Sequence, residues 1–264
     1  MGVLDEIVAH KREELAARRA ARPQSELEAA CRRLPPARDF AEALTPGPDR
    51  PVRLIAEVKK ASPSKGVLAA DLDVTGQARA YAAAGADAVS VLTDARWFKG
   101  SLDDLVAVRG AMSRALLRKD FTVDEYHLWE ARAAGADAAL LIVAALDAAA
   151  LRDLFQAAKG IGVHVLVEAH TAAELEDALT LGARVVGVNN RNLQTLQTDL
   201  ATSLRLLPLI PPGHVAVAES GIFTRDDVER VARAGAHAVL VGEALVRAAD
   251  ISAKVRELTL QGAA

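Results

Sequence analysis

The sequence predicts an α/β protein, a closed (β/α)8 barrel (TIM barrel) with an N-terminal helical extension. Eight short runs of Val, Leu, Ile and Ala recur along the 264 residues. Such runs are typical of strands that a parallel sheet buries on both faces. Segments with helix signals lie between the runs, and three of these segments end in glycine. Eight alternating units in a chain of this length match a closed barrel better than an open doubly wound sheet.

Residues 1–51 precede the first run and are expected to form the helical extension, with the barrel spanning residues 52–264. The basic stretch 11–22 is interleaved with glutamates and lies beside apolar residues at helical spacing, which predicts a solvated amphipathic helix. The prolines of residues 45–51 prevent a continuous helix. The extension fits a plug for the barrel bottom, a dimerisation arm or a cover over the mouth.

All but the fourth of the predicted strands end in a polar or charged residue. The strands are expected at residues 54–58, 88–93, 115–119, 139–144, 164–168, 185–189, 215–219 and 238–242. A buried strand has no structural reason to carry such an ending. Because the carboxyl ends of all barrel strands open at one rim, these polar ends are expected to meet at a single mouth.

The connecting helices carry start and stop signals. Glycines at positions 135, 182 and 235 follow helical segments, where a left-handed helix end favours glycine. Three pairs have the spacing at which a helix start is capped reciprocally: Thr122 with Glu125, Thr171 with Glu174, and Thr224 with Asp227. Each pair comes directly after a predicted strand.

Composition excludes several classes of function. The net charge is −3 and aromatic residues make up 3%, so nucleic acid is not an expected partner. The six histidines show no spacing that places two on one metal, which predicts surface or capping roles and no metal site. Cys31 lies outside the barrel and is not expected to act as a nucleophile. Early acidic residues and the lack of a long uncharged stretch predict a cytoplasmic protein without a membrane partner.

The first predicted strand ends in a charged pair. Glu57 and Lys59 are two residues apart, so both side chains are expected to face the barrel interior near its rim. A buried ion pair is the alternative interpretation, but desolvating both charges makes such a pair a poor stabiliser. The loop that follows, through Gly66, is expected to be mobile and to close over a charged ligand.

Further ionisable residues follow the third, fifth and seventh strands. Lys119, Glu168 and Glu219 each come after an apolar run, where burial and neighbouring charges shift a pKa toward the range of a catalytic acid or base. A structural salt bridge is the alternative for each residue alone. Together with the charged pair of the first strand, these ionisable residues are too many at one rim for a purely structural role.

The remaining strand ends suggest an anionic ligand. Asn189 and Arg191 follow the sixth strand and suit a carboxylate or a hydroxyl group. Small residues follow the last two strands, whose loops are the usual phosphate site of this fold. These residues are Ser220, Gly221, Gly242 and Glu243. The sequence therefore predicts a small phosphorylated ligand.

The sequence resembles the indole-3-glycerol phosphate synthase family over almost its whole length. The resemblance rests on residues 55–64, 90–94 with 98–100, 117–121, 166–168, 187–193 and 219–222. It implies ring closure of 1-(2-carboxyphenylamino)-1-deoxyribulose 5-phosphate to indole-3-glycerol phosphate, a step of tryptophan biosynthesis. Carbon dioxide and water are lost, and the family needs neither metal nor organic cofactor.

The resemblance also implies a role for each polar residue at the mouth. Lys119 is placed as the general acid that neutralises the alkoxide formed in ring closure, and Glu168 faces the cationic ring that results. Lys59 and Glu57 are placed as acid and base of the dehydration, with the allotment open because coupled charges share their protons. Asn189 is given an orienting role, and Glu219 and Ser220 complete the set of catalytic residues.

Other positions correspond to substrate contacts of the family. The expected substrate-binding residues are Ser62, Phe98, Phe121, Arg191, Leu193 and Leu240, and the expected phosphate-binding residues are Ser220, Gly221, Gly242 and Glu243. The backbone amide of Glu243, not its carboxylate, is the expected phosphate contact. The extension resembles the family's helices that partly cover the mouth, with residues 38–40 in their second half. The chain is expected to be a monomer, with a dimer as the alternative.

Three alternatives are weighed against this assignment. Phosphoribosylanthranilate isomerase is a neighbouring phosphate-binding barrel, but its family uses a cysteine where Glu57 stands here. A Schiff-base aldolase would use Lys119 as a nucleophile. A non-catalytic protein that binds a phosphorylated ligand is the third, and the complete set of ionisable residues argues against it. His127 stands where the family often has glutamine.

Overall fold

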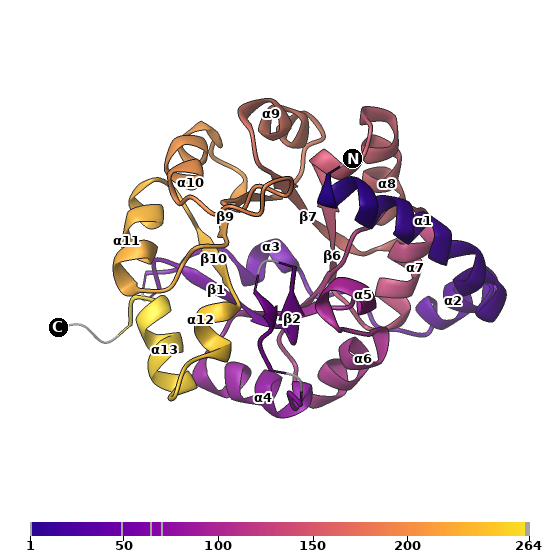
Figure 1. Cartoon of the computed structure of the whole chain (residues 1–264), viewed down its shortest axis with the longest axis horizontal. Coiled ribbons are helices and arrows are strands. Elements are labelled where there is room, and N and C mark those ends of the chain that lie inside the picture. Colours follow the sequence, from indigo (N-terminus) through magenta and orange to yellow (C-terminus); the bar gives the residue numbers. More distant parts are fainter. Residues whose placement is uncertain (1, 49, 64, 70, 262–264) are drawn as a thin grey trace.

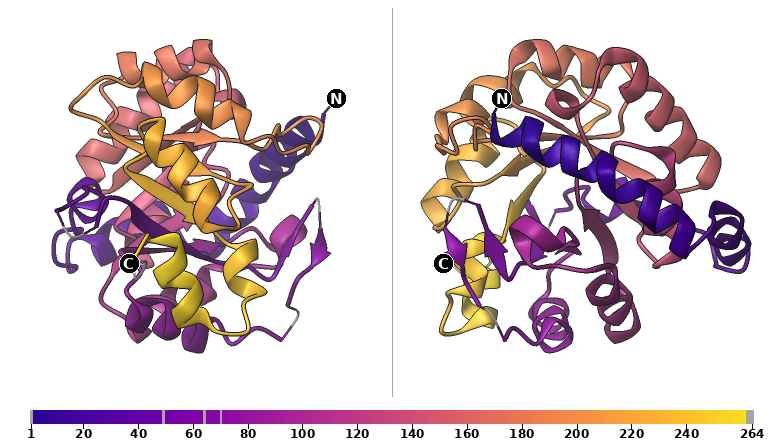
Figure 2. Two further views of the ribbon diagram at one scale, coloured as in Figure 1. Left: turned by 90° about the vertical axis from the view of Figure 1, so that its left-hand side faces the viewer. Right: turned by 45° about the vertical axis from the view of Figure 1, so that its right-hand side comes forward.

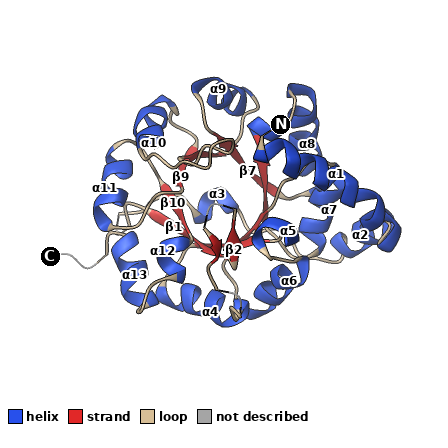
Figure 3. Cartoon of the chain, viewed as in Figure 1, coloured by secondary structure: helices blue, strands red, loops and turns tan. Residues whose placement is uncertain are grey.

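The computed structural model describes residues 2–48, 50–63, 65–69 and 71–261. Eight parallel strands form a closed barrel in the order β1-β10-β9-β8-β7-β6-β5-β4, surrounded by helices (Figures 1 and 3). The strands are β1 (Arg53–Val58), β4 (Ala88–Leu92), β5 (Ala115–Lys119), β6 (Ala138–Ile142), β7 (His164–Ala169), β8 (Val185–Asn189), β9 (Val215–Glu219) and β10 (Ala238–Val241). Each lies within two residues of its predicted bounds, and the predicted fold class is confirmed.

Alternate residues of each strand enter two different cores. Leu54 and Ala56 of β1 pack in the outer core between strands and helices, whereas Ile55 packs inside the barrel. Leu117 of β5 and Leu166 of β7 also lie in the inner core. Because side chains alternate along a strand, the residues two positions further on face inward as well. The strands thereby direct Glu57, Lys119 and Glu168 into the mouth.

Helices connect the strands and cover the outside of the barrel. They are α4 (Val74–Ala84), α5 (Ala95–Phe98), α6 (Leu102–Ala111), α7 (Glu125–Ala133), α8 (Ala148–Ile161), α9 (Ala172–Thr180), α10 (Ala201–Leu206), α11 (Arg225–Arg233), α12 (Glu243–Val246) and α13 (Ile251–Leu258), with 3-10 turns η1 (Val143–Ala145) and η2 (Leu207–Leu209). Gly135, Gly182 and Gly235 have φ angles of 89°, 73° and 109°, which confirms the predicted left-handed helix ends.

The three predicted capping pairs have different outcomes. Thr224 and Asp227 cap α11 reciprocally, as predicted. The Thr171 side chain accepts from the amide of Glu174, but the Glu174 carboxylate turns to the amide of His170, so only half of that pair forms. The prediction for Thr122 is wrong: Asp124 caps α7 by accepting from the Tyr126 amide at 2.8 Å. Asp124, which is nearer to the start of α7, takes the N-cap position.

The extension contains α1 (Val3–Ala21), α2 (Gln24–Cys31) and α3 (Phe40–Ala43). In Figure 2, α1 lies at the same end of the barrel as the loop that follows β1. The short helix α3 lies behind the ring of strands in Figure 1, and Phe40 packs with Ala88 and Val215, which begin their strands. The extension therefore reaches both ends of the barrel, and its second half lies on the floor, away from the mouth.

The loop after β1 contains a short antiparallel hairpin, β2 (Ala61–Ser62) with β3 (Gly66–Val67). Lys60, just before the hairpin, pairs with Asp104 of α6 at 2.7 Å. The sequence predicted a mobile loop here and did not predict this pairing. The hairpin holds Ser62, which is buried, over one side of the mouth.

Candidate active site

A cavity that is partly open to solvent lies at the carboxyl ends of the strands. Every residue that the sequence predicted for the site lines this cavity. They are Glu57, Lys59, Ser62, Phe98, Lys119, Phe121, Glu168, Asn189, Arg191, Leu193, Glu219, Ser220, Gly221, Leu240, Gly242 and Glu243. Side chains from separate parts of the sequence thus meet around one space, as the barrel topology requires.

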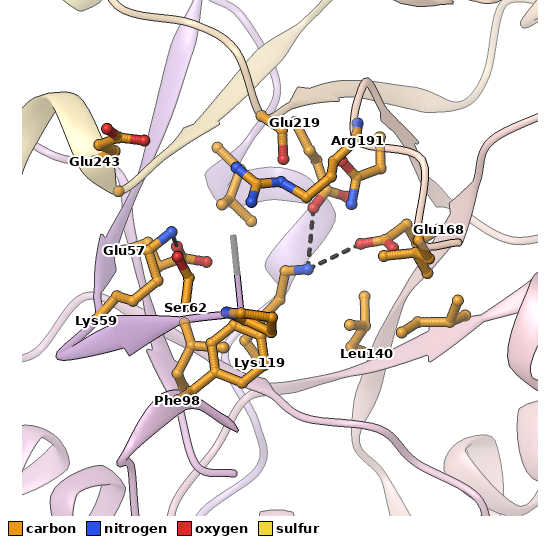
Figure 4. Close-up of a pocket in the computed structure, with 18 of the residues that line it drawn as sticks. Glu57, Lys59, Ser62, Phe98, Lys119, Leu140, Glu168, Arg191, Glu219 and Glu243 are labelled. Atoms are coloured by element: carbon orange, nitrogen blue, oxygen red, sulfur yellow. Dashed lines mark hydrogen bonds and ion pairs between the residues drawn. The ribbon is translucent and has the colours of Figure 1, made fainter. Parts of the chain in front are cut away.

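Lys119 lies at the centre of the cavity between two carboxylates (Figure 4). Its Nζ is 2.8 Å from Glu168 Oε2, to which it donates a hydrogen bond, and 3.2 Å from Glu219 Oε2. The two glutamates come from β7 and β9 and are each 1% exposed. A lysine held in this way is an ammonium group that faces the cavity.

The surroundings of these three residues shift their pKa values. Burial disfavours the ammonium of Lys119, but the neighbouring glutamates, Glu168 foremost, outweigh burial and raise the pKa of Lys119. Burial also opposes ionisation of Glu168, but the charge of Lys119 holds the pKa of Glu168 below its usual range. Burial and the charge of Glu168 together raise the pKa of Glu219. The site therefore contains a charged pair and one carboxyl group with a strong proton affinity.

The second charged pair lies across the cavity on β1. Lys59 Nζ is 2.6 Å from Glu57 Oε1, and both side chains are largely buried. A Cβ atom on Gly242 would lie 2.5 Å from Glu57 Oε1 and 3.2 Å from Lys59 Nζ. Gly242 is thus the residue at the end of β10 that leaves space for the pair.

A glycine also makes room for Glu219. A Cβ atom on Gly187 of β8 would overlap the carboxylate of Glu219 on the neighbouring strand β9. The resemblance placed Gly187 in a motif but gave it no task. Its close approach to Glu219 supplies a physical one, because a larger residue would displace this carboxylate.

The loop after β8 is fixed by two asparagines. Asn189 Oδ1 accepts from the Arg191 amide at 3.0 Å, and the polar Asn189 side chain also helps to lower the pKa of Glu168. Asn190 donates to the Ser220 carbonyl at 2.9 Å and accepts from the Ser203 amide at 2.8 Å. Asn189 therefore orients the backbone that carries Arg191.

The end of β9 turns sharply at the edge of the cavity. Ser220 and Gly221 have φ angles of 64° and 73°. Two successive left-handed residues form a turn that exposes backbone amides, and a serine in this region carries strain that is common at ligand sites. The Glu243 carboxylate is 3.1 Å from Arg247 and 4.0 Å from Lys65, so its own charge is paired.

Apolar side chains also line the cavity. The rings of Phe98 and Phe121 are 6.3 Å apart, and Leu140, Leu193 and Leu240 lie elsewhere in the lining. A flat aromatic group fits between such side chains while its polar substituents reach the charged residues.

Residues of α1 also line the cavity, and the sequence did not identify them. Val3, Leu4 and Ile7 form part of the lining. Leu4, Ile7 and Lys11 are all buried and are spaced three and four apart, so they share one helix face. Periodicity indicated an apolar face here but not what it covers.

Lys11 contradicts the predicted solvated helix. Its Nζ is 2.7 Å from Asp94 and 3.0 Å from Asp120, and its side chain is 1% exposed. Burial opposes its charge, but the two aspartates outweigh burial and raise the pKa of Lys11. A basic residue in a charged stretch is usually solvated, and only the docked position of α1 reveals these partners.

Surface or capping roles were predicted for the histidines, but not all of them lie at the surface. His127 is 2% exposed, and its Nδ1 accepts from the Val123 amide at 3.3 Å. Burial lowers the pKa of His127 to about 3, so the ring is neutral. His170 lies beside Glu168, with its Nε2 3.4 Å from Glu168 Oε1.

Within the described part of the chain, no group of three or more His, Cys, Asp or Glu residues could hold a metal ion. Cys31 lies in α2, outside the cavity, and burial raises the pKa of its thiol. Among the described residues, no helix is long and apolar enough to cross a membrane.

The sequence of this chain is similar to known proteins over its whole length. Residues 4–258 match the family described as indole-3-glycerol phosphate synthase. The indole-3-glycerol phosphate synthase of Kineococcus radiotolerans is 52% identical over 100% of this chain and 97% of its own length. That of Roseiflexus sp. (strain RS-1) is 50% identical over 97% of each protein, and that of Nocardioides sp. is 52% identical over 98% of each.

Solved structures share the barrel at much lower identity. A thiamine phosphate pyrophosphorylase from Pyrococcus furiosus matches with a TM-score of 0.59 at 15% identity, covering 80% of this chain and 96% of that chain. A 3-hexulose-6-phosphate synthase from Salmonella typhimurium matches with a TM-score of 0.61 at 17% identity, covering 79% and 97%. At these identities the likeness concerns the fold alone.

Proposed function

The chain belongs to the indole-3-glycerol phosphate synthase family, and from this membership we propose which residue performs each step of its reaction. The enzyme is a decarboxylating lyase of tryptophan biosynthesis that acts on a small phosphorylated substrate. It closes the ring of 1-(2-carboxyphenylamino)-1-deoxyribulose 5-phosphate to indole-3-glycerol phosphate. One molecule each of carbon dioxide and water is released.

Ring closure is assigned to Lys119 and Glu168. The aromatic carbon that carries the carboxylate attacks the ketone, and Lys119 donates its proton to the ketone oxygen as negative charge develops there. The 2.8 Å hydrogen bond to Glu168 keeps Lys119 charged before this step. Glu168 then faces the cationic ring and stabilises it until carbon dioxide leaves. Glu219, near the same ammonium, completes the polar ring.

Dehydration is assigned to the pair on β1. The hydroxyl group leaves as water with a proton from an acid, and a base removes a proton from the neighbouring carbon. Lys59 and Glu57 are 2.6 Å apart and fit these two tasks as ammonium acid and carboxylate base. Asn189 holds the neighbouring backbone, which supports a role in orienting the substrate.

Substrate binding is assigned to the rest of the lining. Phe98, Phe121, Leu193 and Leu240 flank the aromatic ring, while Arg191 and Ser62 contact its polar substituents. The phosphate is assigned to the ends of β9 and β10, at Ser220, Gly221, Gly242 and the backbone amide of Glu243. The left-handed turn at Ser220 and Gly221 supports this assignment, because both residues line the cavity and turns can bind anions through their backbone amides.

Residues 1–51 and 52–264 are proposed to act as one unit, because α1 supplies Val3, Leu4 and Ile7 to the cavity wall. A monomeric, cytoplasmic enzyme that uses no cofactor is proposed as well. A membrane or nucleic-acid partner is not proposed, since the net charge of −3 provides no basic surface for either.

The single observation that carries these assignments is the position of Lys119 between Glu168 and Glu219 in the cavity. It also distinguishes acid catalysis from a Schiff-base mechanism, because a nucleophilic lysine needs a lowered pKa and that of Lys119 is raised. An activity assay distinguishes the enzyme from a protein that only binds a phosphorylated ligand, because only the enzyme forms product.

The experiment follows indole fluorescence from the carboxyphenylamino substrate. Wild-type protein is expected to form product, Lys119→Ala to lose about 10³-fold in kcat, and Glu168→Gln about 10²-fold. The control is Lys159→Ala on α8, an exposed lysine outside the cavity, which is expected to keep full activity. Circular dichroism checks that each variant is folded. A folded Lys119→Ala variant with most of its turnover would refute the assignment.

A further inference from the structure

This inference rests on the proposed function, in which each turnover takes up one proton from solution. The ketone oxygen receives one proton in ring closure, and the leaving hydroxyl receives a second. One proton is returned when the carbon beside the leaving hydroxyl is deprotonated. The carboxylate leaves as neutral carbon dioxide and returns none, because its bonding electrons stay in the ring. Two protons are given and one is recovered, so the enzyme ends each cycle one proton short.

Lys119 is the residue that is left without its proton. The pair on β1 restores itself, since the proton that Glu57 accepts can pass over 2.6 Å to the Lys59 that has just lost one. Lys119 has no such partner, because its proton leaves with the product. The enzyme therefore needs a way to return a proton to Lys119 after each turnover.

A chain of ionisable groups runs from Lys119 toward solvent. Lys119 Nζ is 2.8 Å from Glu168 Oε2, and the other oxygen, Glu168 Oε1, is 3.4 Å from His170 Nε2. On the far side of the ring, His170 Nδ1 is 3.2 Å from Glu174 Oε2. The side chains are 12% exposed for Lys119, 1% for Glu168, 11% for His170 and 20% for Glu174. Glu174, at the outer end of the chain, is the most exposed of the four side chains.

The hydrogen bonds fix where the protons of His170 lie. Glu174 Oε2 accepts from the His170 backbone amide at 2.8 Å, and the same oxygen faces Nδ1, so Nδ1 carries a hydrogen. The opposite nitrogen, Nε2, is buried and faces the carboxylate oxygen of Glu168 with no hydrogen-bond partner among the described residues. Two acceptors at 3.4 Å repel each other unless a proton lies on one of them. Either His170 or Glu168 therefore holds an extra proton next to Lys119.

The charges that face His170 favour this extra proton. Burial opposes the imidazolium, and Lys119 opposes it as well, but the hydrogen bond to Glu174 and the negative charges of Glu168 and Glu174 outweigh them and raise the pKa of His170. Glu219 does not offer the same route. Among the described residues, no hydrogen bond or ion pair leads from the Glu219 carboxyl group toward the surface.

We propose that His170 is a positioning residue that acts through Glu168: it returns a proton from Glu174 and solvent to Lys119 after each turnover. The proton moves from His170 Nε2 to Glu168 Oε1, the carboxyl group of Glu168 turns, and the same proton then passes to the neutral amine of Lys119. His170 is then neutral, with its hydrogen on Nδ1, and its ring turns so that the bare Nε2 takes up a proton from solvent and returns to Glu168. Ring closure itself uses only the proton that Lys119 already holds.

Rapid mixing of His170→Asn with excess substrate tests this relay. Asparagine keeps an N–H donor for Glu174 but cannot exchange a proton. The first turnover is expected at the wild-type rate, giving a burst of one indole per active site. A steady state about 10²-fold slower should follow. Added imidazole should accelerate the steady state and leave the burst unchanged. The control is His164→Asn at the opposite end of β7, which is expected to behave as wild type.

Each other outcome overturns the relay. A steady state as fast as wild type would show that Lys119 recovers its proton without His170. A burst slowed as much as the steady state, with no rescue by imidazole, would show that His170 merely supports the structure. Burst size counts the active sites that fold, so partial misfolding does not hide the result. A wild-type protein that forms no indole would instead remove the proposed function itself.

Discussion

The charged side chains of the mouth are costly to bury, and each therefore has a partner. Lys119 is held between Glu168 and Glu219, and Glu57 is held by Lys59. Ion pairs of this kind rarely stabilise a fold more than apolar residues of similar size. Their concentration at one cavity is accordingly better explained by chemistry than by folding.

His127 provides a prediction about pH and stability. Its folded pKa of about 3 lies below the ordinary value of 6.5, so the unfolded chain binds more protons between these values. Stability contributed by this residue is therefore present above pH 6.5 and is lost as the pH falls toward 3. Between pH 7 and pH 5 the loss amounts to about 2 kcal/mol. Urea unfolding at both pH values measures it.

The matched variant is His127→Gln, which keeps an acceptor for the Val123 amide but does not titrate. The free energy of unfolding of this variant is expected to fall less than that of the wild type between pH 7 and pH 5, by about 2 kcal/mol. Since other histidines titrate equally in both proteins, the difference isolates His127. Parallel pH profiles for the two proteins would contradict a neutral buried ring.

Single residues were predictable where the strand pattern decides their direction. Glu57, Lys119 and Glu168 each lie two positions after an inward apolar residue, so alternation alone places them in the mouth. The burial of Lys11 and His127 could not be predicted in the same way. Their surroundings come from segments distant in the sequence, such as Asp94 and Asp120 around Lys11.

Among the elements, α1 makes a buried ionic contact with the barrel in addition to its apolar contacts. Lys11 neutralises Asp94 and Asp120, and its removal leaves two buried carboxylates with less compensation. Lys11→Ala is expected to lower the free energy of unfolding by about 3–5 kcal/mol. KM should rise as well, because α1 carries Leu4 and Ile7 into the cavity wall. Urea unfolding and steady-state kinetics measure the two effects.

Arg19→Ala is the matched control on the same helix. Arg19 pairs with Asp124 at 2.6 Å, but its side chain is 49% exposed. Exposed pairs contribute less than about 1 kcal/mol, so this variant should retain the wild-type stability and KM. Equal losses for the lysine and arginine variants would show that burial of the Lys11 contact is not what holds α1.

The strands were predicted more accurately than the caps and the hairpin. Continuous apolar runs identify strands that are buried on both faces, and all eight lie within two residues of their expected bounds. Cap spacing was a weaker signal, because a competing Asp124 takes the position expected for Thr122. The β2–β3 hairpin has only two residues in each strand, which is too short for a periodic pattern.

At the scale of the whole molecule, the barrel brings two acid–base groups to one mouth. Lys119 with its glutamates comes from β5, β7 and β9, whereas Glu57 lies in β1 and Lys59 directly after it. The sequence predicted that these groups converge, because all strand ends share one rim. It did not reveal that the extension reaches both ends of the barrel, with Phe40 on the floor and Leu4 at the cavity.

The central claim is that these two groups act in succession, Lys119 in ring closure and Lys59 in dehydration. The most direct measurement compares carbon dioxide release with indole formation in Lys59→Ala, using substrate labelled in its carboxylate under single-turnover conditions. Labelled carbon dioxide is expected to appear clearly before indole, because ring closure and decarboxylation precede the step that lacks its acid. Carbon dioxide and indole appearing together at one reduced rate would contradict the division of labour.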